Sequence, residues 1–256
     1  MTNTPRARPI ARLCALMALG VASAIGHAAT PSKEPDAMTQ AQAETLSARQ
    51  QAIVPIAAHA AAGDMPRLAE ALDRSLDAGL TVSDAKEILV QLYAYAGFPR
   101  SLNALGELMK VIEARKQRGI QDAPGREPGR AIPKGDALLA AGTANQTRLA
   151  GAPVKGPLFD FAPVANEYLR AHLFGDIFER DNLDWQSREI ATVSMLAALQ
   201  GADSQLQSHM GISMNVGIST GQLTQLTQVL ADQVGLEAAT RARGALARQM
   251  AAKAKP

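Results

Sequence analysis

The stretch LYAYAGFPRSLNAL, residues 92–105, combines the end of one helix with the start of another. Gly97 lacks a Cβ atom and can adopt the left-handed backbone conformation that commonly ends a helix. Pro99 fits the first turn of the next helix, where its missing N–H group would have no partner in any case. The stretch therefore predicts two helices joined by a turn at Gly97.

The aromatic and basic residues of this stretch permit different interpretations. Tyr93 and Phe98 are expected to pack in the hydrophobic core at the helix end. For Tyr95 and Arg100 two interpretations stay open. They either belong only to the helix end, or they reach a pocket and bind substrate there.

The same pattern recurs 138 residues further along the chain. At this offset Gly97 is matched by Gly235, and the other matched pairs are Gly63 with Gly201, Leu68 with Leu206, Gly79 with Gly217, Leu92 with Leu230, Ala104 with Ala242 and Gly106 with Gly244. Glycines that end helices at matched positions impose the same helix lengths twice. The sequence therefore predicts one helical unit that is repeated.

The composition of the 256 residues favours an all-α fold. Hydrophobic residues make up 47% but aromatic residues only 4%, and Ala, Leu and Gln are abundant, which suits helices better than sheets. No strand is expected. Thr81 with Asp84 and Ser219 with Gln222 have the spacing of capping boxes, and Pro55 should kink its helix or mark a later start. Helices are expected at about 47–62, 66–78, 82–96, 99–117, 161–179, 185–200, 204–216, 220–234 and 236–252.

The first residues have the features of a signal peptide. Three arginines precede the apolar run LCALMALGVASAIG, and small residues suited to cleavage follow near Ala28. The alternative is an uncleaved membrane anchor, although the apolar run is short for a span. We therefore expect a periplasmic or secreted protein, with a signal peptide at 1–28, a flexible lead-in at 29–45, a first repeat at 46–118, a Gly/Pro-rich connecting segment at 119–159 and a second repeat at 160–252.

Loss of the leader changes the charge and the cysteine content. Removing three arginines and no acid shifts the formal net charge from +2 to −1, so we expect neither nucleic-acid binding nor membrane binding after cleavage. The only cysteine, Cys14, lies in the leader. The mature chain is then expected to have no disulfide, no redox centre and no cysteine nucleophile.

Two stretches resemble a known family. LYAYAGFPRSLNAL (92–105) and SREIATVSMLAALQGADSQLQSHMGISMNVGIS (187–219) are similar to the recurring stretches of the carboxymuconolactone decarboxylase family. The resemblance implies the all-helical AhpD-like (alkylhydroperoxidase D-like) fold, here as an exported tandem-repeat member. It also implies a homo-oligomer, and with two repeats in one chain dimers or trimers are expected.

The family includes two chemistries. Thiol peroxidases of the family have a Cys-X-X-Cys motif followed four residues later by His, and aligning that His with His209 places the cysteines at Ala202 and Gln205. Peroxidase chemistry is disfavoured because it needs two thiols. The decarboxylases act on a carboxylated muconolactone without a cofactor. That reaction requires hydrogen-bond donors to the lactone carbonyl and an acid that protonates the carbanion equivalent.

His209 is the candidate for this acid. It lies about 60° from the apolar stripe of its expected helix, and Ala71 occupies the matching place in the first repeat. Glu189, one residue from the place of the family's glutamate, could orient His209 or shuttle a proton. The alternatives are a histidine at the edge of the core and a solvated first-turn acid.

Gln205 and Arg188 are further candidates for binding polar groups of a substrate, with an exposed surface arginine as the alternative for Arg188. The other histidines of the expected mature chain, His59 and His172, do not have metal-ligand spacing with His209, and no metal or cofactor site is expected.

Two functions are therefore considered. The first is a cofactor-independent decarboxylase, or a related lyase or isomerase, that acts on a small lactone or organic acid. The second is a non-catalytic exported protein that binds a small ligand or serves as an oligomeric scaffold.

Overall fold

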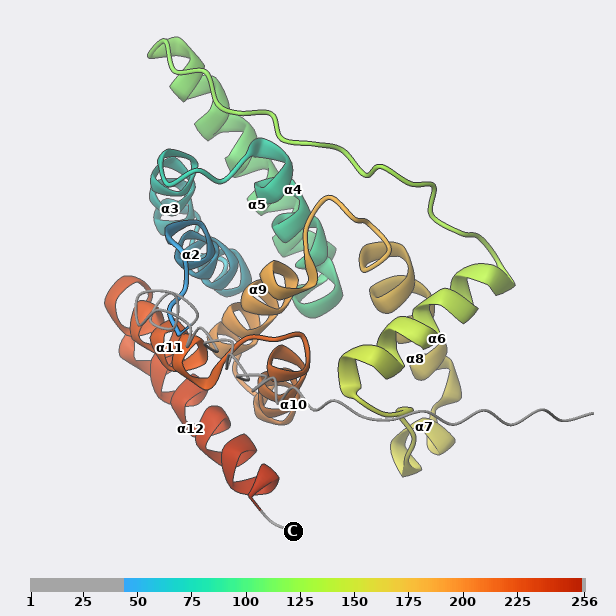
Figure 1. Ribbon diagram of the computed structural model, residues 1–256. Helices are drawn as coiled ribbons and strands as arrows, with labels where there is room; N and C mark the ends of the chain where they lie inside the picture. The colour runs from blue at the N-terminus through green and yellow to red at the C-terminus, as the bar shows by residue number, and fades with distance from the viewer. Residues whose placement is uncertain (1–43, 255–256) are drawn as a thin grey trace, which may run out of the picture. The chain divides into compact units, whose positions relative to one another are not determined.

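The computed structural model describes residues 44–254, and in this part of the chain the regular elements are helices without any strand (Figure 1). This confirms the expected all-α fold. The expected signal peptide and most of the expected lead-in lie outside the described residues. The elements are α2 (Ala48–Ala62), α3 (Met65–Asp77), α4 (Val82–Gln91), α5 (Tyr93–Gln117), α6 (Asp136–Ala150), α7 (Pro157–Phe161), α8 (Pro163–Tyr168), the π-helix η1 (Leu169–Ile177), α9 (Trp185–Ala198), α10 (Asp203–Asn215), α11 (Thr220–Gln233) and α12 (Leu236–Lys253).

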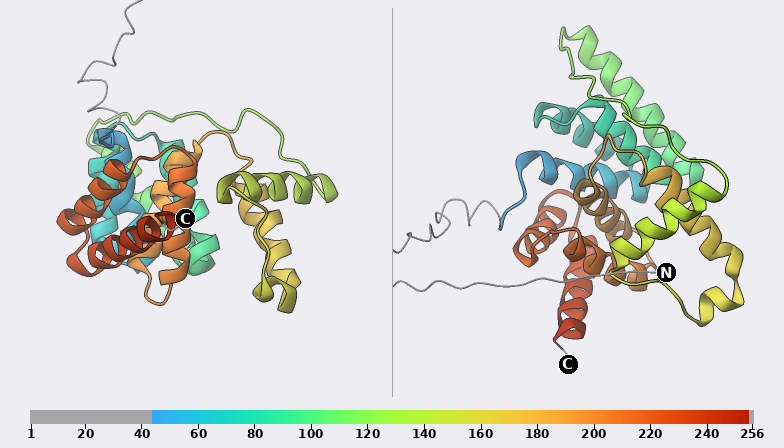
Figure 2. Two further views of the ribbon diagram at one scale, coloured as in Figure 1. Left: turned by 60° about the horizontal axis from the view of Figure 1, so that its bottom comes forward. Right: turned by 45° about the vertical axis from the view of Figure 1, so that its right-hand side comes forward.

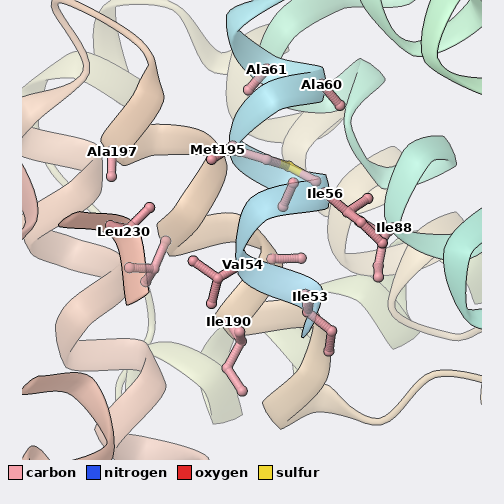
Figure 3. Packing of buried hydrophobic residues seen from close by; sticks show 14 of the residues in the cluster. Ile53, Val54, Ile56, Ala60, Ala61, Ile88, Ile190, Met195, Ala197 and Leu230 are labelled. Atoms are coloured by element: carbon pink, nitrogen blue, oxygen red, sulfur yellow. The ribbon is translucent and has the colours of Figure 1, made fainter. Parts of the chain in front are cut away.

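Helices α2 and α9 form the centre of the core and pack along each other. Most residues of both helices are buried, so both are covered on most sides. Figure 3 shows side chains of α2, among them Val54 and Ile56, between α9 on one side and α4 on the other. Ile190 and Met195 of α9 are fully buried in the same cluster. The α9 helix is therefore positioned by apolar packing, and its polar side chains start from this fixed position.

The ends of α4, α5 and α11 follow the sequence signals. Thr81 and Ser219 each accept a hydrogen bond from a backbone N–H in their own first turn, and both capping boxes are complete. Gly97 has a φ of 80° and divides α5 into two helical parts, which confirms the predicted turn at this residue. The later start expected at Pro55 is wrong, because α2 begins before this residue and continues through it. The kink at Pro55 stays a prediction.

Helix bounds in the two halves share the offset seen in the sequence. Helix α3 begins at Met65 and α10 at Asp203, which are 138 residues apart, and α4 and α11 begin with the same separation. The matched glycines Gly79 and Gly217 both have positive φ angles, of 93° and 91°. That the two units share one three-dimensional structure stays a prediction.

Three local expectations differ from the structure. The Gly/Pro-rich segment contains a regular helix, α6, whose Ala- and Leu-rich sequence lies between the glycines. The helix expected at 161–179 begins at Pro163, because a short helix, α7, ends before it at Phe161, and its second half is the π-helix η1. Phe98 is not a core residue: it is 60% exposed and stacks on Tyr93 with ring centroids 4.5 Å apart.

Helix α6 and η1 form a second, smaller packing unit, visible beside the long connection from α5 (Figure 2). They cross closely because Gly142 of α6 has no side chain, and a Cβ there would overlap the Arg170 carbonyl. Leu149, Phe174 and Phe178 form their apolar cluster, against which residues of the larger core pack, namely Tyr93, Tyr95, Trp185, Ile212 and Val216.

A buried arginine ties the connecting segment to the first half of the fold. The Arg115 guanidinium is 3% exposed and contacts Asp73, Asp77 and Asp122 at 2.8–2.9 Å. The hydrogen bond to Asp122 and those to the other two carboxylates outweigh burial and raise the Arg115 pKa. This ion cluster joins α3, α5 and the start of the connection to α6.

We expect Arg115→Met to lower the free energy of unfolding by about 3 kcal/mol, because the substitution leaves the buried Asp122 carboxylate without its partner. Urea denaturation followed by circular dichroism measures this change. Arg118→Met is the matched control, since the Arg118 side chain is 52% exposed and among the described residues pairs only with Asp73, and its effect should be below about 1 kcal/mol. Equal effects of both substitutions would contradict the account.

Candidate active site

The structure brings His209 and Glu189 into direct contact. His209 on α10 and Glu189 on α9 meet where these helices pack, with 2.8 Å between His209 Nδ1 and Glu189 Oε2. The Glu189 side chain is 0% exposed and that of His209 is 9% exposed. The alternative of a solvated first-turn acid is therefore wrong for Glu189. For His209 both interpretations stay open, because a histidine at the edge of the core and a proton-transfer group can each bond to a buried carboxylate.

The two ring nitrogens of His209 have different environments. Nδ1 faces the Glu189 carboxylate, and because an ionised carboxylate can only accept a hydrogen bond, the proton of this contact lies on Nδ1 when Glu189 is ionised. Nε2 has no hydrogen bond to the described residues, and it is not among the buried atoms that lack a partner. Nε2 is therefore the nitrogen that reaches the surface, and it can exchange a proton with a ligand or with solvent.

Tyr95, on α5, lies beside His209. The two rings meet edge to face, at an interplanar angle of 80° with 5.8 Å between their centroids. The Tyr95 hydroxyl is 3.2 Å from Thr192 Oγ1 on α9. Burial raises the pKa of Tyr95, and the negative charge of Glu189 raises it further. Tyr95 is thus a neutral phenol next to His209. A candidate residue from the first half of the chain therefore lies beside the Glu189–His209 pair, which comes from the second half.

Arg188 points into a separate buried network. Its side chain is 0% exposed, which excludes the alternative of a surface arginine. It donates hydrogen bonds to Glu87 Oε2 at 3.0 Å and to Gln91 Oε1 at 3.2 Å. Arg180 also pairs with Glu87, at 2.6 Å. The terminal nitrogens of Arg188 are therefore already engaged within the protein.

This network fixes the charge states of its members. Burial disfavours the charged form of Glu87, but hydrogen bonds from Arg180, Arg188 and Asn182 outweigh it and hold the Glu87 pKa below its usual value. Burial lowers the pKa of Arg188, although the pairing with Glu87 opposes this. The network attaches α4 to α9 directly beside Glu189. It is the part of the site that the sequence-based prediction missed, although Glu87 and Gln91 lie one turn apart on α4.

Gln205 and Arg100 are not brought to the pair. Gln205 is exposed and accepts a hydrogen bond from Ser204 at 2.9 Å. Arg100 is half-buried beside Gly63, and neither residue has a hydrogen bond, ion pair or ring contact with His209 in the described part of the chain. Their assignment as substrate-binding residues stays a prediction without support from the geometry.

The remaining histidines serve other contacts. His59 is buried, and its Nε2 lies 3.1 Å from the Gln233 carbonyl oxygen. Burial lowers the pKa of His59, so the ring is kept neutral and donates to this carbonyl. His172 is exposed on η1 and lies 2.9 Å from Asp176. Within residues 44–254, no three His, Cys, Asp or Glu side chains are grouped as metal ligands would be.

Two hollows lie away from the pair. One of about 790 Å³ follows the face of α6 between Asp136 and Arg148, and one of about 520 Å³ lies around Trp185 and Asn215. Neither is lined by His209 or Glu189. Of the pair itself, only the His209 side chain has exposed surface, so a ligand would meet the pair at His209.

The described helices include none that is both long enough and apolar enough to span a bilayer.

Comparison with known proteins identifies the family of the segment that carries the pair. No curated protein matches the chain. Residues 163–248, which include α9, α10 and both members of the Glu189–His209 pair, match the model of the carboxymuconolactone decarboxylase family. The segment that carries the pair thus has the sequence of a carboxymuconolactone decarboxylase family member.

Proposed function

We propose that the protein is a cofactor-independent enzyme that moves a proton at a carbon atom of a small lactone or organic acid. The decarboxylase reaction of the family is the first candidate, and a related lyase or isomerase reaction uses the same groups. The observation that carries the proposal is the buried 2.8 Å contact between His209 Nδ1 and Glu189, which leaves Nε2 at the surface.

The arrangement suits the chemistry of decarboxylation. The bond between the carboxylate carbon and the ring breaks, carbon dioxide leaves, and the electron pair is delocalised toward the lactone carbonyl. An imidazolium at His209 then gives its Nε2 proton to the carbon, and solvent returns a proton to Nε2. Glu189 is the positioning residue, because its carboxylate orients the ring and stabilises the imidazolium as an ion pair.

Peroxidase chemistry is not part of the proposal. The sequence contains one cysteine, Cys14, whereas the peroxidase branch needs two thiols next to the histidine. The corresponding positions here are Ala202, at the start of α10, and the exposed Gln205.

We expect His209→Gln to lower kcat/KM by at least about 100-fold for 4-carboxymuconolactone, because the proton donor is lost. Glu189→Gln should cause a smaller loss of about tenfold, since the ring stays in place without its anionic partner. Release of carbon dioxide measures turnover, and deuterium uptake from heavy water measures proton transfer to carbon.

His172→Gln is the control for these substitutions, because His172 is exposed and pairs with Asp176. Both residues lie on η1 and not on the helices of the Glu189–His209 pair. Its kinetics should equal those of the wild type. Full activity of the His209 variant would rule out this histidine as the acid. Wild-type protein without turnover or deuterium uptake would favour the ligand-binding or scaffold function instead.

A specific observation supports the oligomer, which we propose as part of either function. Helix α5 carries an apolar stripe with the alternating three- and four-residue spacing of a helix–helix seam. Phe98, Leu102 and Met109 are 60%, 61% and 72% exposed. Leu105 and Ile112 continue the stripe and are half-buried. A second copy of the chain would cover this surface.

We expect Leu102→Glu to weaken self-association at least about tenfold, because a charge would replace an apolar side chain in the seam. Sedimentation velocity over a concentration series measures the change. Met250→Glu, at a 47% exposed position on α12, should leave the association constant unchanged. A monomeric wild type at all concentrations would contradict the proposal.

A further inference from the structure

Thr192 is the junction of a hydrogen-bond chain that ends at Tyr95. Its hydroxyl oxygen lies 2.8 Å from Gln91 Nε2, 3.0 Å from the Arg188 carbonyl oxygen and 3.2 Å from the Tyr95 hydroxyl. A threonine hydroxyl has one proton, so it can donate to only one of the two oxygens. Which oxygen receives that proton decides what the Tyr95 hydroxyl can do.

The carbonyl of Arg188 already has its complement of donors. Gln91 Nε2 donates to it at 3.0 Å, and the geometry of α9 directs the backbone N–H of Thr192 to the same oxygen. A carbonyl oxygen has two lone pairs, and these two donors use both. The Thr192 hydroxyl therefore donates its proton to the Tyr95 hydroxyl and accepts a hydrogen bond from Gln91 Nε2.

The proton of Tyr95 then has no acceptor within the described residues. The hydroxyl accepts from Thr192, and Glu189 Oε1 is a buried atom with no hydrogen-bond partner, so it does not receive this proton. Burial and the Glu189 charge raise the pKa of Tyr95, which keeps the phenol protonated across the usual range. The site thus holds an unused O–H donor next to the histidine ring.

We propose that the Tyr95 hydroxyl donates a hydrogen bond to the carbonyl oxygen of a lactone that binds against Nε2 of His209. This inference rests on the proposed function and adds to it the group that receives the electron pair. A donor at this carbonyl stabilises the negative charge that develops on oxygen while Nε2 protonates carbon. The Gln91–Thr192 chain fixes the direction of the donor. Ligands without a carbonyl at this place lose the contact.

The test uses a matched pair of ligands and a matched pair of variants. The ligands are 5-oxotetrahydrofuran-2-carboxylate and tetrahydrofuran-2-carboxylate, which differ only in the lactone carbonyl. The full chain and its Tyr95→Phe, Tyr93→Phe and His209→Ala variants are titrated with each ligand by calorimetry. Tyr93 is the control because its ring stacks on Phe98, away from His209.

We expect Tyr95→Phe to weaken binding of the lactone about tenfold and to leave binding of the carbonyl-free ligand unchanged. Tyr93→Phe should change neither. Equal effects of Tyr95→Phe on both ligands, or no effect on either, would overturn the role of Tyr95. If His209→Ala still weakens both ligands in that case, the proposed function stands without this inference. If neither ligand binds the wild type, both the proposed contact between Tyr95 and a lactone carbonyl and the proposed lactone substrate class would be wrong.

Discussion

A carboxylate that is removed from water needs a partner, and Glu189 has one hydrogen-bonding partner, His209. This constraint organises the candidate site. It joins α9 to α10, turns Nδ1 of His209 inward, and leaves Nε2 at the surface. The other Glu189 oxygen, Oε1, has no partner in the described part of the protein, which is unusual for a buried acceptor and typical of a functional site.

The surrounding network explains why this arrangement can persist. Arg188 follows directly before Glu189, yet its guanidinium is used by Glu87 and Gln91, so it does not neutralise Glu189. The two buried polar clusters on α9 are linked, because Gln91 bonds both to Arg188 and to Thr192, and Thr192 contacts Tyr95. The Arg188 cluster attaches α4 to α9, and its terminal nitrogens are engaged, while Arg188 Nε and Asn182 Oδ1 are buried without a partner among the described residues. What distinguishes the Glu189–His209 pair is that Nε2 of His209 reaches the surface.

Local signals made much of the fold predictable. The capping residues Thr81 and Ser219 and the turn at Gly97 act within a few residues, so sequence alone locates them. The pairing of Glu189 with His209 was also foreseen, as one interpretation among others. The exposure of Phe98, the engagement of Arg188 and the distance of Gln205 from the site depend on which distant helices pack together. No local pattern contains that information, and the Gly/Pro-rich composition around α6 concealed its helix.

The central claim is that Glu189 holds a proton on Nδ1 of His209 and leaves Nε2 free for chemistry. Nitrogen-15 NMR of the histidine side chains, with His209 assigned from its substitution, measures this directly. The account predicts that neutral His209 is the Nδ1–H tautomer and that Glu189→Gln shifts the ring away from this single form. A neutral ring protonated on Nε2 in the wild type would contradict it.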